Sequence, residues 1–96
     1  MSEIMKIEEI TDELQKLNDW EIIDVGSIPR LMKVYSFKNF AEALEFTNQV
    51  GILAEEENHH PEIITEWGKT TVTWWTHSAG GLSPNDFAMA AKVDQI

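Results

Sequence analysis

The chain has 96 residues, 43% hydrophobic and 25% charged, which is the size and composition of one globular domain spanning residues 1–96. It contains no cysteine, which excludes disulfides, thiolate nucleophiles, iron–sulfur clusters and sulfur-ligated zinc. Seven Lys and Arg residues against seventeen Asp and Glu residues give a net charge of −10. Such a surface repels phosphate backbones, so we expect no direct nucleic-acid binding.

Targeting and nucleotide-binding motifs are absent from the sequence. The N-terminus, "MSEIMKIEEI", carries acidic residues where a secretory signal needs basic ones. No apolar run approaches the roughly 20 residues of a membrane span. Neither G-x-x-x-x-G-K-[ST] nor G-x-G-x-x-G occurs, which disfavours a nucleotide enzyme. We therefore expect a cytoplasmic protein that does not enter a membrane.

The first third of the chain predicts a helix followed by a hairpin. Apolar residues at steps of three and four indicate a helix that ends near residues 18–19: Ile4, Ile7, Ile10, Leu14 and Leu17. The segment "WEIIDV" (20–25) is typical of a strand, "GSIP" (26–29) of a turn, and "RLMKVYSF" (30–37) of the returning strand.

A second helix is predicted from Phe40 to about Glu57. Asn39 is a suitable N-cap, and Glu42 stands three residues later, in the capping-box position. One broad face is apolar: Ala43, Leu44, Phe46, Val50, Leu53 and Ala54. Ile52 falls on the polar side instead, which indicates a surface for a partner.

The last third predicts a second hairpin and a closing helix. The strands "EIITEW" (62–67) and "TTVTWWTH" (70–77) flank a turn at Gly68–Lys69, and the adjacent Trp74 and Trp75 must point to opposite faces of the sheet. Ser83 caps a final helix, "PNDFAMAAKVDQI". The order α-β-β-α-β-β-α predicts an α+β fold, an antiparallel sheet with helices packed against it.

All three histidines of the chain are expected to meet at the open end of the second hairpin. With Gly68 and Lys69 in the turn, the ladder brings His60 opposite His77, and His59 opposite Ser78. Directly opposed residues have Cβ atoms about 4.5–5.5 Å apart.

Three clustered imidazoles can bind a metal or move protons. The side chains of His59 and His60, as successive residues at the start of a strand, diverge and do not easily point at one ion. The sequence therefore favours acid–base catalysis with no metal and no cofactor, and leaves a tri-histidine metal site as the lesser alternative.

One joint pattern resembles a known family. Glu55 is followed after three residues by His59-His60-Pro61, then after five by Trp67, after nine by His77 and after eight by Asp86. With "SFKNF" and "GGLSPND", this pattern resembles the pterin-4a-carbinolamine dehydratases along nearly the whole chain. The resemblance implies a four-stranded antiparallel sheet with three helices packed on one face.

The resemblance also implies an activity. Family members remove water from 4a-hydroxytetrahydrobiopterin to give quinonoid dihydropterin, which recycles the pterin cofactor of an aromatic amino-acid hydroxylase. Catalysis by His59, His60 and His77 is then implied. Substrate binding is implied for these histidines and their neighbours: Pro61, Thr76, Ser78 and Ala79. We read Asp86 as an acid at a helix N-terminus rather than as a catalyst.

Two departures and one competing function stand beside this interpretation. Asn58 replaces an acid, and Ile63 replaces an aromatic residue, that many members carry. Because animal members also dimerise a homeodomain transcription factor, a non-catalytic module with a transcriptional or hydroxylase partner is the alternative. A small core, Ile52 and the apolar last helix further predict a homodimer or homotetramer.

Overall fold

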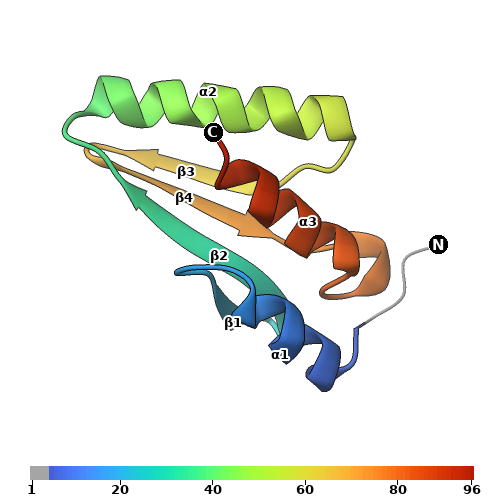
Figure 1. The fold of residues 1–96 in the computed structure, drawn as a ribbon. Helices are drawn as coiled ribbons and strands as arrows, with labels where there is room; N and C mark the ends of the chain where they lie inside the picture. The colour runs from blue at the N-terminus through green and yellow to red at the C-terminus, as the bar shows by residue number, and fades with distance from the viewer. Residues whose placement is uncertain (1–4) are drawn as a thin grey trace.

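The computed structural model describes residues 5–96, so Ile4 of the expected first helix lies outside it. The elements in chain order are α1 (Ile7–Gln15), β1 (Glu21–Val25), β2 (Ile28–Ser36), α2 (Phe40–Glu57), β3 (Glu62–Glu66), β4 (Lys69–Trp74), a short 3-10 helix η1 (His77–Ala79) and α3 (Pro84–Val93). The strands form one antiparallel sheet in the order β1-β2-β4-β3. Three α-helices pack on one face of it, and the expected α+β class and element order are confirmed (Figure 1).

The core lies between the sheet and the helices. Leu31 of β2 and Val72 and Trp74 of β4 point toward the helices and are fully buried. The helices cover them with apolar side chains: Phe46, Val50 and Ala54 of α2, and Phe87, Met89, Ala90 and Val93 of α3. The last helix was expected to leave apolar surface uncovered, and this was wrong, because its apolar residues are part of the core. Among residues 5–96, no helix is both long and apolar enough to span a membrane.

Helix α2 begins and ends where the sequence predicted. The side chain of Asn39 caps it by accepting a hydrogen bond of 2.9 Å from the backbone N–H of Glu42. The predicted apolar face is buried except at Leu44, which is 42% exposed. Ile52 is 61% exposed, in agreement with its predicted place on the outer side.

Helix α1 is shorter and looser than expected. It ends at Gln15 rather than near residues 18–19, and none of its residues is fully buried. Ile10 and Leu14 pack partly buried against the core. Ile7 is 79% exposed and does not join them, because it is the first residue of the helix and lies beyond the core.

The first hairpin turns on two residues instead of four. Gly26 and Ser27 both have positive φ, +58° and +67°, as a two-residue type I′ turn requires. Ile28 and Pro29, expected in the turn, therefore belong to β2 and pair with Val25 and Asp24. The ladder tolerates Pro29 because β2 begins to pair with β4 only at Leu31.

The second hairpin has a different register from the predicted one. Its turn is Trp67–Gly68, so Thr65 faces Thr70 and Glu66 faces Lys69. Gly68 supplies the positive φ of +79°, and its carbonyl accepts a 2.8 Å hydrogen bond from the N–H of Phe37. This bond fixes the turn against the end of β2.

As a consequence, His60 and His77 are not opposed in the ladder. Ile63 faces Val72, and the pairing begins at Glu62, after the proline that follows His60. Strand β4 ends at Trp74, three residues before His77. The predicted pairing of these histidines is therefore wrong, and any proximity between them must come from the loops at the strand ends.

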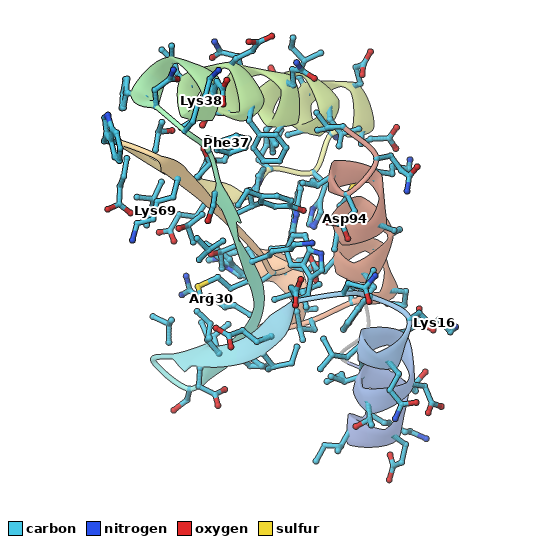
Figure 2. The ribbon with its side chains drawn as sticks, turned by 60° about the vertical axis from the view of Figure 1, so that its left-hand side comes forward. Lys16, Arg30, Phe37, Lys38, Lys69 and Asp94 are labelled. Atoms are coloured by element: carbon cyan, nitrogen blue, oxygen red, sulfur yellow. The ribbon has the colours of Figure 1, made fainter. Side chains whose placement is uncertain are left out.

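A carboxylate ties the end of α3 to the sheet. Asp94 accepts hydrogen bonds from the indole N–H of Trp20 at 3.0 Å, from Lys33 Nζ at 2.9 Å and from the hydroxyl of Tyr35. Figure 2 shows Asp94 on the side of the sheet that α3 covers. Burial alone raises the pKa of Asp94, but the hydrogen bonds from Tyr35, Lys33 and Trp20 outweigh it and hold that pKa below 3.8.

Asp94→Asn is expected to lower the free energy of unfolding near neutral pH by about 1–3 kcal/mol, because the variant loses hydrogen bonds to a charged group. The lowered pKa means that the folded protein favours the ionised carboxyl. This contribution is complete above the ordinary pKa of 3.8 and is lost as pH falls through the lower folded value. Urea unfolding of both proteins from pH 7 down to about pH 2 measures this. The difference should shrink on acidification, and a widening difference would contradict the assignment.

Candidate active site

The C-terminus of α2 places His59 and His60. Asn58 adopts the left-handed conformation with φ of +53°. The N–H of His59 donates to the carbonyl of Ala54 at 3.1 Å, and the N–H of Asn58 donates to that of Glu55 at 3.3 Å. These two bonds form a Schellman motif, in which asparagine is one of the few residues that tolerate the left-handed position. Asn58 suits this position, and the left-handed turn lets both histidines leave the helix together.

A short loop after β4 places His77. The N–H of Thr76 donates to the carbonyl of Gly81 at 2.7 Å, and these two residues form an isolated antiparallel bridge. The bridge closes a loop that contains η1, whose first residue is His77, and Gly80 ends η1 with a positive φ of +67°. The loop returns His77 toward the end of α2.

The two segments enclose a cavity of about 450 Å³. Five residues predicted to form the site line it: His59, His60, Thr76, His77 and Ser78. Asn58 and Trp75 complete the lining. The three histidines therefore share one cavity, as expected, although loops rather than the ladder bring them together. Pro61 and Ala79 lie next to lining residues in the chain but outside the lining, so their part in substrate binding stays a prediction.

His59 is the most firmly held of the three imidazoles. Its Nε2–H donates to Asp86 Oδ1 at 2.6 Å, and its ring stacks on Trp74 with centroids 5.3 Å apart and an angle of 17° between the planes. The side chain is only 15% exposed. Since Nε2 faces a carboxylate, Nδ1 is the nitrogen left for a substrate.

Asp86 does more than its sequence position indicated. It is the third residue of α3 and closes a capping box, because its Oδ2 accepts from the backbone N–H of Ser83 at 2.9 Å. The same oxygen accepts from the hydroxyl of Thr76 at 2.8 Å. The carboxylate is fully buried, and all of these donors converge on it. The helix-terminal interpretation was correct but incomplete, because Asp86 also orients His59. The joint spacing pattern, which ends at Asp86, was the only sequence signal for this second role.

His60 and His77 are freer. His60 Nε2 lies 2.5 Å from Glu55 Oε2, but both side chains are exposed, at 55% and 78%. His77 is exposed at the start of η1. The site thus joins one buried, doubly held imidazole to two imidazoles at the solvent edge. Such side chains can exchange protons with water between turnovers.

The described residues offer no ready metal site. Among residues 5–96, no three histidine or acidic side chains are grouped as metal ligands. Both His59 and His60 use Nε2 to contact a carboxylate. The geometry therefore lends no support to the tri-histidine metal alternative.

The chemistry of its lining, rather than its volume, makes this cavity the candidate active site. A larger hollow of about 680 Å³ lies along α2 beside Ile52 and Ile63. Besides these two isoleucines and Gly51, its lining has polar or acidic side chains but no histidine: Thr47, Asn48, Glu55 and Glu56. Only the cavity at the end of β4 combines several imidazoles with a concave surface, within residues 5–96.

The fold and this cavity together define a small α+β domain with three histidines around one cavity. Residues 3–96 match the family model described as pterin 4 alpha carbinolamine dehydratase. The chain belongs to this family.

Sequence relatives agree with the family model. A protein of Microcystis aeruginosa, provisionally named a pterin-4-alpha-carbinolamine dehydratase, is 56% identical over 93% of this chain and 77% of its own length. A protein of Chlorobaculum tepidum with the same provisional name is 48% identical over 96% of this chain and 83% of its own length.

Two solved structures share the fold. One, described as a transcriptional coactivator/pterin dehydratase from Brucella melitensis, superposes with a TM-score of 0.84 at 30% identity and covers 95% of both chains. The other is described as a pterin dehydratase-like protein that acts as a RuBisCO assembly factor in the alpha-carboxysome. It superposes with a TM-score of 0.66 at 25% identity, over 81% of this chain and 88% of its own.

Proposed function

We propose that this protein dehydrates 4a-hydroxytetrahydrobiopterin to quinonoid dihydropterin by acid–base catalysis with His59, His60 and His77. The observation that carries the proposal is the cavity of about 450 Å³ that all three histidines line. Its volume suits a bicyclic heterocycle, since ligand cavities commonly span about 300–1,000 Å³. Membership of the dehydratase family supports the same substrate class.

The reaction requires two proton transfers and no redox step. One imidazolium delivers a proton to the hydroxyl on carbon 4a, the bond between that carbon and oxygen breaks, and water leaves. A second, neutral imidazole removes the proton from nitrogen 5, and its electron pair forms the double bond between nitrogen 5 and carbon 4a. Each positioned acid or base contributes about 10²–10⁴-fold.

The surroundings of the three histidines suggest which part each imidazole takes in these proton transfers. His59 is fixed by Asp86 and Trp74 with Nδ1 available, so it holds a proton donor or acceptor in one orientation. His60 and His77, at the solvent edge, supply the second imidazole that the reaction needs and exchange protons with water after each turnover. Pro61, Thr76, Ser78 and Ala79 border the histidines, and their backbone groups would bind the polar edge of the pterin.

Purified protein should accelerate the dehydration of freshly generated 4a-hydroxytetrahydrobiopterin in a stopped-flow experiment, and the acceleration should survive a metal chelator. The physical reason is that imidazoles alone suffice for both proton transfers. Absence of any acceleration would refute the proposed function. Loss of activity with the chelator, followed by recovery with zinc, would favour the metal alternative.

A second function, as an interaction module, is favoured by a specific observation. The solved structures with this fold include one described as a transcriptional coactivator/pterin dehydratase and one described as an assembly factor. Exposed apolar side chains on α2, Leu44 and Ile52, offer a surface for a partner. The intact set of histidines supports the enzyme as the primary function, with a transcriptional or hydroxylase partner as the alternative.

We also expect a homodimer or homotetramer. The domain is small, and Ile52 and Leu44 on α2 remain exposed. Sedimentation at micromolar concentration should give a mass above the 11.0 kDa of one chain. Ile52→Glu should shift the mass toward one chain, whereas Ile7→Glu, at a more exposed site on α1 (79% against 61%), should leave it unchanged. A single 11.0 kDa species for the unsubstituted protein would contradict this expectation.

A further inference from the structure

Trp75 forms an aromatic wall of the histidine cavity that the dehydration mechanism does not use. Its indole is the only large aromatic ring system in the lining, and the rest of the lining is imidazole, hydroxyl and amide. Trp75 follows β4 directly and is half-buried. Because Trp74 points into the core, its successor Trp75 points to the sheet face opposite the helices.

Arg30 holds the indole of Trp75 from the neighbouring strand. Leu31 pairs with Trp74 in the ladder, so Arg30 is the cross-strand neighbour of Trp75 one step beyond. The guanidinium carbon lies 3.8 Å from the centroid of the Trp75 ring, well within the roughly 6 Å of a cation–π contact. Figure 2 shows Arg30 on the side of the sheet away from α3.

Trp75 is the main residue that the guanidinium of Arg30 contacts. Its Nε is buried and has no hydrogen-bond partner among residues 5–96. No carboxylate in the same range forms a salt bridge with it. A buried guanidinium N–H without a partner is unusual, so the orientation of Arg30 is set by the ring it covers. The cation occupies one face of the indole and restrains the ring at the cavity wall.

We propose that Trp75, held by Arg30, is the surface against which the ring system of the pterin packs, and that the pair determines pterin affinity. The inference rests on the proposed function, since it names a binding element of the same cavity. A flat bicyclic heterocycle needs an apolar surface as well as polar partners at its edge. Stacking of such a ring on an aromatic side chain is favourable and depends little on the substituents at its edge.

The pair should act on binding more than on chemistry. The pterin ring is present in both the ground state and the transition state, so a wall that contacts it stabilises both. Loss of such uniform binding raises KM and leaves kcat nearly unchanged. Arg30 touches Trp75 and does not line the cavity, so it is a positioning residue.

The test compares variants of the pair with a matched tryptophan outside the cavity. Trp75→Leu keeps an apolar side chain without the ring and should raise KM about tenfold, with kcat changed less than about threefold. Trp75→Phe should retain much of the affinity. Arg30→Met should raise KM about threefold, and Arg30→Lys, which keeps the cation, should restore most of it. The control is Trp67→Leu, because Trp67 is 74% exposed in the hairpin turn at the other end of β4 and should leave KM unchanged.

A second measurement separates this inference from the proposed function. Calorimetric titration with 7,8-dihydropterin reports ring binding without catalysis, and Trp75→Leu should weaken it about tenfold. Suppose that the unsubstituted protein is active and that Trp75→Leu changes neither KM nor the affinity measured by titration. This result would refute the role of Trp75 in pterin binding and would leave the proposed dehydratase activity unaffected. If the unsubstituted protein is inactive, the proposed dehydratase activity is refuted. The titration still shows whether the pterin ring binds against Trp75. If Trp75→Leu does not fold, the KM of Arg30→Met becomes the test. An unchanged KM for this variant would refute the proposal that Arg30 and Trp75 together determine pterin affinity.

Discussion

Replacing His77 or His60 with alanine should lower the turnover number for carbinolamine dehydration by about 10²-fold or more, the usual contribution of a positioned proton donor or acceptor. Both residues line the cavity, and neither packs in the core. The midpoint of unfolding should therefore change little, because side chains at a solvent-exposed edge contribute little to stability. Steady-state kinetics and urea unfolding on the same samples separate the two effects.

The double variant adds a sharper expectation. If the two imidazoles work in one proton-transfer unit, removing both should cost less than the product of the separate losses. Lys69→Ala, at an exposed position where β4 begins, far from the cavity, serves as the control and should retain full turnover. Full activity in His77→Ala would remove His77 from the mechanism, whatever its place in the cavity.

Of all these variants, Asp86→Ala should lower the free energy of unfolding the most, by about 3 kcal/mol, because it leaves buried donors without their acceptor. The donors are the hydroxyl of Thr76, the backbone N–H of Ser83 and Nε2–H of His59. Asp86→Asn keeps the shape and should fold better. It should nevertheless lower turnover, because a neutral amide does not fix the tautomer of His59 as a carboxylate does. Thermal or urea unfolding together with kcat checks both statements.

Glu55 provides the matched control for Asp86. It also contacts Nε2 of a histidine, His60, but its side chain is 78% exposed. Glu55→Ala should therefore change stability by less than about 1 kcal/mol, as is usual for an exposed ion pair. Equal destabilisation by the two alanine substitutions would mean that burial does not distinguish these carboxylates.

The starts of α2 and α3 were the part of the fold that the sequence predicted best. Asn39 before α2 and Ser83 with Pro84 before α3 each bring side chains or a fixed φ that act within three or four residues. Such local chemistry can be read without knowing the rest of the molecule. Ile7 shows the limit of periodicity, because the spacing of apolar residues does not tell how far along its axis a helix overlaps the core.

The register of the second hairpin could not be read so directly. Both Trp67–Gly68 and Gly68–Lys69 contain the glycine that a tight turn needs, and shifting from one to the other leaves every side chain on the same sheet face. The choice depends on the bond between Phe37 and Gly68, which are far apart in the chain. The convergence of the histidines was nonetheless predicted correctly, because either turn leaves the same strand ends together.

Asp86 was missed as a site residue for a different reason. An acid at the third position of a helix has a sufficient local explanation, so its contact with His59, 27 residues earlier, is invisible in the sequence. The sequence placed Trp75 on the sheet face opposite Trp74, but only the contact with Arg30 on the adjacent strand shows what holds its ring. Both roles depend on tertiary contacts between elements that the sequence does not place.

The loose attachment of α1 divides the molecule into two levels of protection against amide hydrogen exchange. None of the residues of α1 is fully buried, whereas α2 and β4, whose C-terminal ends lead into the cavity, and α3 all contribute to the core. Opening α1 alone exposes little apolar surface, so it requires far less free energy than global unfolding. The amides of α1 should exchange through such sub-global openings, while those of α2 and β4 exchange only when the whole domain unfolds. The cavity therefore remains intact through most of the fluctuations that the chain undergoes.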